Sequence, residues 1–198
     1  FAKKDTGGMT FGEALQNIGY EGKEEARLKE ASAFLELHIE QGPILEQESL
    51  SIGVVECVVG MVCYEWEILG ESDHAGTTPM AMRKDASFMA AAIMMVLRQR
   101  LSQLDEELVF TMGRMNVEPN IHTVIPNKVV FSLEARHKDP EVIRQVEEII
   151  ASVREAFTDN DCSVSNRKLW GRSTVMFDGQ LCSIVEKAAR SLGYSYKR

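Results

Sequence analysis

The chain has 198 residues, of which 44% are hydrophobic and 26% are charged, and this is the composition of a folded globular protein rather than a disordered one. Its 30 acidic residues outnumber its 22 basic ones, so the net charge of −8 argues against nucleic acid or an anionic membrane as a partner. The longest apolar run, residues 88–97, is too short for a membrane span, and the first residues lack a signal-peptide pattern. The four cysteines form no C-x-x-C pair and are expected to be reduced thiols of a cytoplasmic protein.

The first expected element is a short helix near the start of the chain. Thr10 followed three residues later by Glu13 matches a capping box, which predicts that the helix begins at Phe11. Gly19 is expected to end it, because glycine readily adopts the conformation that closes a helix. The charged residues 21–33 favour a solvated turn or loop.

Three further short elements are expected before residue 60. Residues 33–39 (AFLELHI) are mostly apolar and of strand length, which predicts a mostly buried strand. The Gly42-Pro43 pair marks a break in the chain after it. One helical turn is expected over residues 44–48, and the β-branched residues within 51–59 predict another strand.

From Gly60 onward the pattern changes to long alternating strands and amphipathic helices. The expected elements are a strand over residues 62–69, a helix over 83–102, strands over 107–116 and 128–136, a helix opened by Asp139 and Pro140, and a strand over 163–170. This β-α-β-β-α-β order is the ferredoxin-like split pattern, so residues 60–165 are expected to form one two-layer α+β domain. The flanking residues, including an amphipathic helix over 181–193, are expected to be two pieces of a second domain.

Two of the four histidines lie in neighbourhoods that favour a functional role. His38 lies near the end of a predicted buried strand, where ligands bind in open α/β sheets, and imidazole is a common zinc ligand. His74 lies in residues 72–80, a loop of small and hydroxyl residues of the kind that often presents functional side chains. The alternatives are a core histidine bonded to a backbone carbonyl for His38 and, for His74, a helix-entry loop in which Thr77 and Thr78 cap the following helix. No short metal motif, phosphate loop or nucleophile elbow accompanies either histidine.

Several blocks of the sequence carry a resemblance to one enzyme family. The blocks are residues 37–43 (LHIEQGP), residues 52–55 (IGVV), residues 73–80 (DHAGTTPM) with Arg83 and Asp85 after them, residues 124–126 (VIP), residues 131–136 (FSLEAR), and Phe177 with Asp178. Nearly the whole chain, in order, resembles the family of N-carbamoyl-L-amino-acid hydrolases, allantoate amidohydrolases and β-ureidopropionases. These are zinc amidohydrolases related to aminoacylase and the di-zinc carboxypeptidases.

The resemblance implies a fold and an assembly. The fold class is α/β: a ferredoxin-like α+β lid, which is also the dimerisation domain, is inserted in a di-metal hydrolase catalytic domain of which only flanking pieces are present. The lid corresponds to residues 60–165, and the catalytic pieces correspond to residues 1–59 and 166–198. A homodimer through the lid domain is therefore expected.

Individual roles follow from the matched motifs. His38 matches one of five side chains that hold two divalent metal ions, expected to be zinc, with manganese, cobalt or nickel as alternatives. Gln41 matches a residue that faces the ureido or amide group of the substrate. His74 matches a histidine that stabilises the oxyanion of the tetrahedral intermediate, often from the partner subunit. Arg136 matches the arginine that clamps the substrate carboxylate, and the alternative is a surface arginine at a strand end.

Two positions depart from the family pattern, and both concern substrate recognition. Thr123 stands where the family usually has a substrate-binding asparagine, although Asn120 and His122 are close by. Val62 stands where the allantoate enzymes often carry an arginine. These departures weaken the case for allantoate, whose extra ureido group needs extra polar partners.

The resemblance thus implies hydrolysis of the ureido C–N bond of an N-carbamoyl-L-amino acid, or a related ureido acid, to the amino acid, ammonia and carbon dioxide. The other four metal ligands and the general base are expected before residue 1 and after residue 198. The chain alone is therefore expected to be inactive and to bind no stoichiometric zinc. The alternatives are an allantoate amidohydrolase, a peptidase of the same superfamily, or a chain that acts only as a dimerisation module.

Overall fold

The computed structural model describes residues 1–23, 30–158 and 160–198. The chain divides into two compact units, Phe1–Gly42 and Pro43–Arg198, so the break falls at the predicted Gly42-Pro43 pair. The expected division into residues 1–59, 60–165 and 166–198 stays a prediction. Among the described residues, no helix is both long and apolar enough to cross a membrane.

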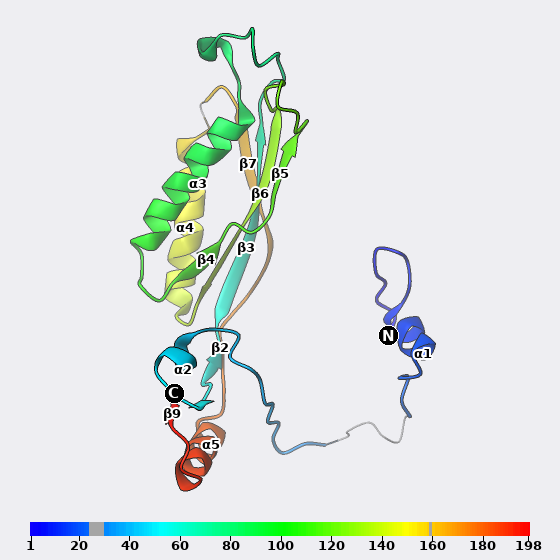
Figure 1. The fold of residues 1–198 in the computed structure, drawn as a ribbon, viewed down its shortest axis with the longest axis vertical. Coiled ribbons are helices and arrows are strands. Elements are labelled where there is room, and N and C mark those ends of the chain that lie inside the picture. Colours follow the sequence, from blue (N-terminus) through cyan, green and yellow to red (C-terminus); the bar gives the residue numbers. More distant parts are fainter. Residues whose placement is uncertain (24–29, 159) are drawn as a thin grey trace. The chain divides into compact units, whose positions relative to one another are not determined.

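The first unit contains a short helix with the predicted cap. An isolated antiparallel bridge joins Lys4 to Thr10, and helix α1, Phe11–Asn17, follows directly (Figure 1). The backbone N–H of Glu13 donates to Thr10 Oγ1 over 3.1 Å, and the N–H of Thr10 donates to Glu13 Oε2 over 2.7 Å. Gly19 has a φ of +69°, which favours glycine and ends the helix as expected. The capping-box prediction is confirmed.

The predicted buried strand over residues 33–39 is wrong for this structure. These residues form neither helix nor strand, and the side chains of Phe34 and Leu37 are 75% and 97% exposed. A strand needs a neighbouring strand to take its backbone hydrogen bonds, and an apolar run does not by itself supply that partner. Of the expected loop over residues 21–33, residues 24–29 lie outside the described residues, and the others form neither helix nor strand.

The second unit is built on an antiparallel sheet backed by two helices. The sheet order is β4-β6-β3-β7, and β5 also pairs with β6. The elements are β3 Gly60–Leu69, α3 Ala86–Ser102, β4 Val109–Thr111, β5 Met115–Glu118, β6 Lys128–His137, α4 Pro140–Ala156 and β7 Ser163–Arg172. This confirms the β-α-β-β-α-β prediction, with the expected strand over residues 107–116 divided into β4 and β5. The first and last strands lie together in the sheet, with the middle pair on one side, as the split pattern requires.

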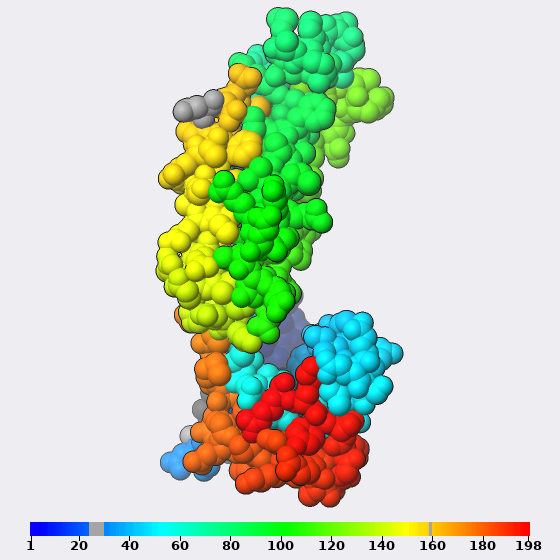
Figure 2. Space-filling view, turned by 90° about the vertical axis from the view of Figure 1, so that its left-hand side faces the viewer, coloured from blue at the N-terminus to red at the C-terminus, as the bar shows by residue number. Residues whose placement is uncertain are grey.

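Helix α4 begins at Pro140 as predicted, whereas α3 begins at Ala86, three residues after the expected start at residue 83. The side chain of Asp85 accepts hydrogen bonds from the first turn of α3, and the side chain of Asp139 does so for α4, whose first residue is Pro140. Both helices cover the same face of the sheet and lie side by side, green and yellow in Figure 2. Trp66 and Phe131 stack beneath them with ring centroids 5.9 Å apart, and both side chains are fully buried.

The other face of the sheet is open and polar. Residues of β6 alternate between the buried core and this face, so Glu134 and Arg136 lie on the open side. Glu65 on β3 forms ion pairs there with Arg114 and Arg167, and the hydrogen bond from Arg167 lowers the pKa of the Glu65 carboxyl. Charged side chains that solvent can reach are therefore carried on a rigid, well-packed support.

The remaining elements of this unit come from both sides of the sheet domain in sequence. They are α2 Ile44–Gln47, β1 Ile52–Gly53, β2 Cys57–Val58, the 3-10 helix η2 Met80–Met82, β8 Val175–Met176, α5 Gly179–Ser191 and β9 Tyr196–Lys197. The expected helical turn over residues 44–48 is present as α2. The expected single strand over residues 51–59 is two short strands, because β1 pairs with β9 and β2 pairs with β8. All four cysteines are free thiols.

Candidate functional site

The loop that carries His74 is joined to the chain segment that carries Thr123. The backbone N–H of Ala75 donates to the Thr123 carbonyl over 2.9 Å, and the N–H of Ile125 donates to the Asp73 carbonyl over 2.8 Å. These bonds form an antiparallel bridge between His74 and Val124. Two predicted site residues, 49 positions apart in sequence, are thus held beside each other, and both side chains are exposed.

A backbone hydrogen bond determines which nitrogen of His74 carries the proton. The N–H of Gly76 donates to His74 Nδ1 over 3.1 Å, so Nδ1 presents its lone pair. A neutral imidazole has one N–H, which must then be on Nε2. A side chain at position 76 would crowd this arrangement, because a Cβ there would lie 3.1 Å from His74 Cε1. His74 therefore offers an exposed Nε2–H donor.

Arg136 lies near the last residue of β6, on the open face of the sheet. It pairs with Met61 of β3 and Val109 of β4 across the ladders. Its Nε donates to Glu134 Oε1 over 2.7 Å, and its Nη2 lies 2.6 Å from the same oxygen. About half of the arginine side chain is exposed, so part of the guanidinium is free to bind an anion.

Cys63 lies directly across the ladder from Glu134 and is buried. Burial, helped by the Glu134 charge, raises the pKa of the Cys63 thiol. This buried cysteine is therefore a neutral thiol and not a thiolate nucleophile.

His74 and Arg136 lie at opposite ends of the sheet. The segment bonded to His74 immediately precedes β6, whereas Arg136 is the ninth of the ten residues of β6. Ten residues of extended strand span about 30 Å. Figure 1 shows the loop before α3 at one end of the sheet, and α5 beyond the other end. One copy of the unit cannot bring both side chains to one small substrate.

His38 and Gln41 lie in the first unit, and both are exposed. His38 Nδ1 donates to the carbonyl of Ile39, so the Nε2 lone pair is available. Ligating histidines commonly donate their second nitrogen to a carbonyl in this way, and His38 therefore fits a metal ligand. Gln41 adopts a φ of +54°, an uncommon backbone conformation for a residue with a side chain.

A second group of ligand-type side chains was not predicted from the sequence. Asp105, Glu107 and His137 place ligand atoms within 4.8 Å of one another, the one such group of three among the described residues. The Asp139 N–H donates to His137 Nδ1 over 3.0 Å, so the proton of the neutral ring is on Nε2, 3.3 Å from Asp105. A protonated nitrogen has no lone pair for a metal. In addition, Lys138 Nζ forms an ion pair with Glu107 Oε2 over 2.7 Å. This group of three side chains therefore does not fit a metal centre.

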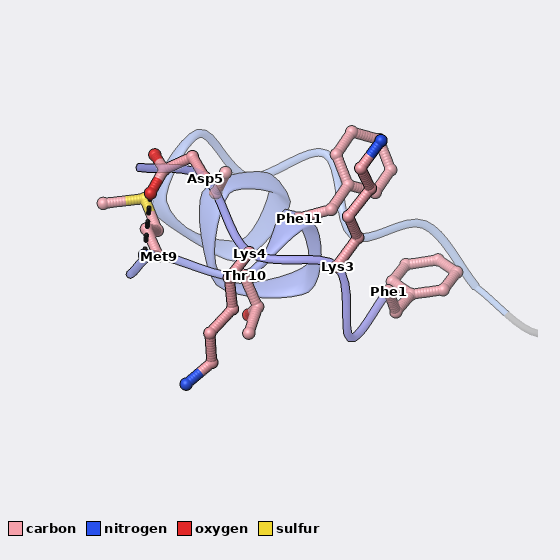
Figure 3. Close-up of a pocket in the computed structure, with 8 residues that line it drawn as sticks. Phe1, Lys3, Lys4, Asp5, Met9, Thr10 and Phe11 are labelled. Atoms are coloured by element: carbon pink, nitrogen blue, oxygen red, sulfur yellow. Dashed lines mark hydrogen bonds between the residues drawn. The ribbon is translucent and has the colours of Figure 1, made fainter. Parts of the chain in front are cut away.

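A hollow in the first unit is lined by none of the predicted site residues. It has a volume of about 560 Å³ and lies between the start of the chain and α1 (Figure 3). Phe1 and Phe11 contribute rings whose centroids are 6.1 Å apart, and Lys3 and Lys4 are the nearby cations. No side chain there is of the kind that the predicted chemistry needs.

Comparisons with known proteins connect these residues to one group. No family model matches the chain. It is 34% identical over 199 residues to the N-carbamoyl-L-amino-acid amidohydrolase of Rhizobium meliloti, covering 99% of this chain and 47% of that protein. It is 35% identical over 158 residues to the allantoate amidohydrolase of Escherichia coli K12, covering 78% of this chain and 38% of that protein.

The solved structures give the same picture. An amidase of the hydantoinase/carbamoylase family from Burkholderia multivorans aligns with a TM-score of 0.82 at 34% identity. The alignment covers 99% of this chain and 48% of that chain. The chain spans about half the length of the curated relatives it matches.

Proposed function

Because the chain belongs to the family of N-carbamoyl-L-amino-acid amidohydrolases and allantoate amidohydrolases, we propose that it forms part of a metal-dependent enzyme that hydrolyses the ureido C–N bond of an N-carbamoyl-L-amino acid. The observation that carries the proposal is the exposed Nε2–H donor of His74, held by Gly76 and by the Thr123 segment. In this proposal the chain acts as part of a protein of the family's length. The four free cysteines of this chain support a reducing compartment such as the cytoplasm.

His74 serves the oxyanion in this proposal. Attack of water on the ureido carbonyl moves negative charge onto the carbonyl oxygen. A neutral imidazole with its proton on Nε2 can donate a hydrogen bond to that oxygen without transferring the proton. Since the charge develops only as the bond to water forms, this hydrogen bond strengthens in the transition state and raises kcat.

Arg136 binds the carboxylate that every N-carbamoyl amino acid carries. Glu134 holds two nitrogens of the guanidinium on one oxygen, which orients the plane of the group on the open face. The remaining N–H groups can bind a carboxylate in a charge-assisted contact. Gln41, in the first unit, would supply amide hydrogen bonds to the ureido group.

His38 would be one ligand of a divalent metal, through Nε2. The Ile39 carbonyl accepts from Nδ1 and so fixes the orientation of the ring whose Nε2 would bind the metal. When bound, the metal supplies Lewis-acid activation of water near neutral pH. Zinc is the proposed ion, because imidazole is one of its common ligands.

The separation of His74 and Arg136 supports a site shared between two copies of the chain. About 30 Å of β6 lies between the two side chains in one copy, far more than a ureido amino acid can bridge. A two-fold dimer can place His74 of one copy beside Arg136 of the other. We therefore include a homodimer in the proposal.

The outer face of α3 is the proposed dimer surface. Four exposed apolar residues follow one another at helical spacing along this face, Phe88, Ala91, Ala92 and Met95. Phe88 and Met95 are 62% and 60% exposed. An apolar stripe of this kind on a charged protein favours burial against a second copy.

Replacing Met95 with glutamate is expected to convert the dimer to a monomer at micromolar concentration, because the interface would have to bury an unpaired charge. Sedimentation of the 198-residue chain measures the mass directly. Ala151→Glu, which adds the same charge to an exposed position of α4, is the matched control and is expected to leave the dimer intact. A wild-type chain that sediments as a monomer at high micromolar concentration would contradict the proposed homodimer.

Allantoate is the second candidate substrate, since an allantoate amidohydrolase is among the relatives. Two positions favour the N-carbamoyl amino acid instead. Thr123 offers one hydroxyl beside His74, and Val62 is buried in the helix-covered core, so neither adds an amide or a cation for a second ureido group.

Turnover rates distinguish the N-carbamoyl amino acid from allantoate as the substrate. A protein of the family's length that contains this chain is expected to release ammonia from an N-carbamoyl-L-amino acid faster than from allantoate, and not to cleave a dipeptide. Chelation should abolish the activity, and added zinc should restore it. Faster turnover of allantoate would favour the second candidate, and activity that survives complete metal removal would contradict the proposal.

A further inference from the structure

One peptide group in the His74 loop is bonded on both sides. The carbonyl of Ala75 and the N–H of Gly76 belong to the same peptide unit. The N–H donates to His74 Nδ1 over 3.1 Å, and the carbonyl accepts from Arg83 Nη2 over 2.6 Å. The guanidinium and the imidazole therefore contact opposite ends of one polar group.

All the hydrogen bonds of the Arg83 side chain within the described residues go to the His74 loop. Its Nε also donates to the Thr78 carbonyl over 3.0 Å, so two nitrogens of one rigid plane hold two carbonyls of the loop. The side chain is half-buried beside the start of α3, which lowers the screening of its charge by water.

We propose that Arg83 is a positioning residue that acts through the Ala75–Gly76 peptide group to hold the His74 ring in the tautomer with its proton on Nε2. A cation on a carbonyl oxygen polarises the peptide unit, and the N–H at its other end becomes a stronger donor. The stronger donor keeps the Nδ1 lone pair engaged. The value of this arrangement for catalysis rests on the proposed function, whereas the state of the ring does not.

The loop keeps other attachments when Arg83 is removed. The two backbone bonds to residues 123–125 and the bonds from Thr77 and Thr78 to the His74 carbonyl involve no arginine atom. A variant at position 83 is therefore expected to fold with the loop in place, while the ring of His74 gains freedom.

The experiment reads the His74 ring directly by nitrogen NMR of the 198-residue chain, labelled at its histidines, at pH 8, where an ordinary imidazole is neutral. The wild type is expected to show a protonated Nε2 and an unprotonated Nδ1. Arg83→Met should move both nitrogens toward the averaged shifts of an exchanging ring. Lys84→Met is the matched control, because it removes the adjacent cation, which pairs with Glu71 and touches no loop carbonyl, and it should leave the ring unchanged.

Arg83→Lys is the second variant. Lysine keeps the charge but reaches one carbonyl rather than two, so a ring state between the wild type and Arg83→Met is expected. If Arg83→Met fails to fold, the ring state of Arg83→Lys tests whether Arg83 holds the His74 tautomer. A folded variant with the wild-type ring pattern would overturn the proposal.

Kinetics separate this inference from the proposed function. In the active enzyme, Arg83→Met should lower kcat by about tenfold, less than loss of the imidazole, with KM nearly unchanged. Millimolar guanidinium ion should restore part of the rate. An altered ring with unchanged kcat would keep the link between Arg83 and His74 and remove His74 from the reaction. An unaltered ring with reduced kcat would contradict the link itself.

Discussion

Replacing His74 with alanine is expected to lower kcat by about a hundred- to a thousandfold in the enzyme that contains this chain, with little change in KM, as the loss of an oxyanion donor typically does. The oxyanion exists only after water attacks, so the ground-state complex loses little binding. Steady-state kinetics with an N-carbamoyl-L-amino acid measures both constants. His122→Ala is the matched control, because this exposed histidine lies beside Thr123 and should be replaceable without loss.

Mixing two inactive variants tests where the histidine acts. If His74 acts across the dimer, His74→Ala and Arg136→Ala subunits together should recover about a quarter of the wild-type activity, because half of the dimers are mixed and each mixed dimer has one intact site. No recovery on mixing would mean that both residues serve the same copy. An unchanged kcat for His74→Ala would show that the loop is structural.

Arg136→Lys is expected to raise KM by about ten- to a hundredfold while kcat falls little. A charged hydrogen bond contributes about 1.5–3 kcal/mol, and lysine keeps the charge but loses the planar pair of donors. The carboxylate is present in both the ground state and the transition state, so its loss weakens binding uniformly. Kinetics with N-carbamoyl amino acids gives both constants.

A substrate analogue without the carboxylate provides the internal control. The decarboxylated amine should be a poor substrate for the wild type and no worse for Arg136→Lys, since neither enzyme can use the clamp. Arg167→Lys alters another arginine of the open face, which pairs with Glu65, and should leave KM unchanged. An analogue that suffers equally from Arg136→Lys would assign the arginine a structural role.

The helices were predictable from short stretches of sequence, because caps and apolar periodicity determine where a helix forms. The Thr10–Glu13 capping box begins α1, and Asp139 with Pro140 begins α4. Of the apolar residues of α4 at a 3.6-residue period, five are buried and Ile149 is partly buried; the five are Val142, Ile143, Val146, Ile150 and Val153. Caps and periodicity depend on residues within one or two turns, so the sequence alone contains the information.

Short strands were less predictable because their partners are distant. The apolar residues 33–39 satisfy a strand pattern but form no strand in this structure. Residues 51–59 divide because one half pairs with β9 and the other with β8, more than a hundred residues away. Strand extent is decided by the neighbour that takes the hydrogen bonds, and no local window contains that neighbour.

The sequence by itself determined the order of the elements in the sheet domain and the start of α4. It also indicated the family, through motifs that contain His38, Gln41, His74 and Arg136. Only the tertiary structure decided which of these side chains meet. It holds His74 beside Thr123, separates both from Arg136 by the length of β6, and leaves the His74 proton on Nε2. The sequence gives the identity of each side chain. The distance between His74 and Arg136 depends on strand register, and the tautomer of His74 depends on a single hydrogen bond in the folded loop.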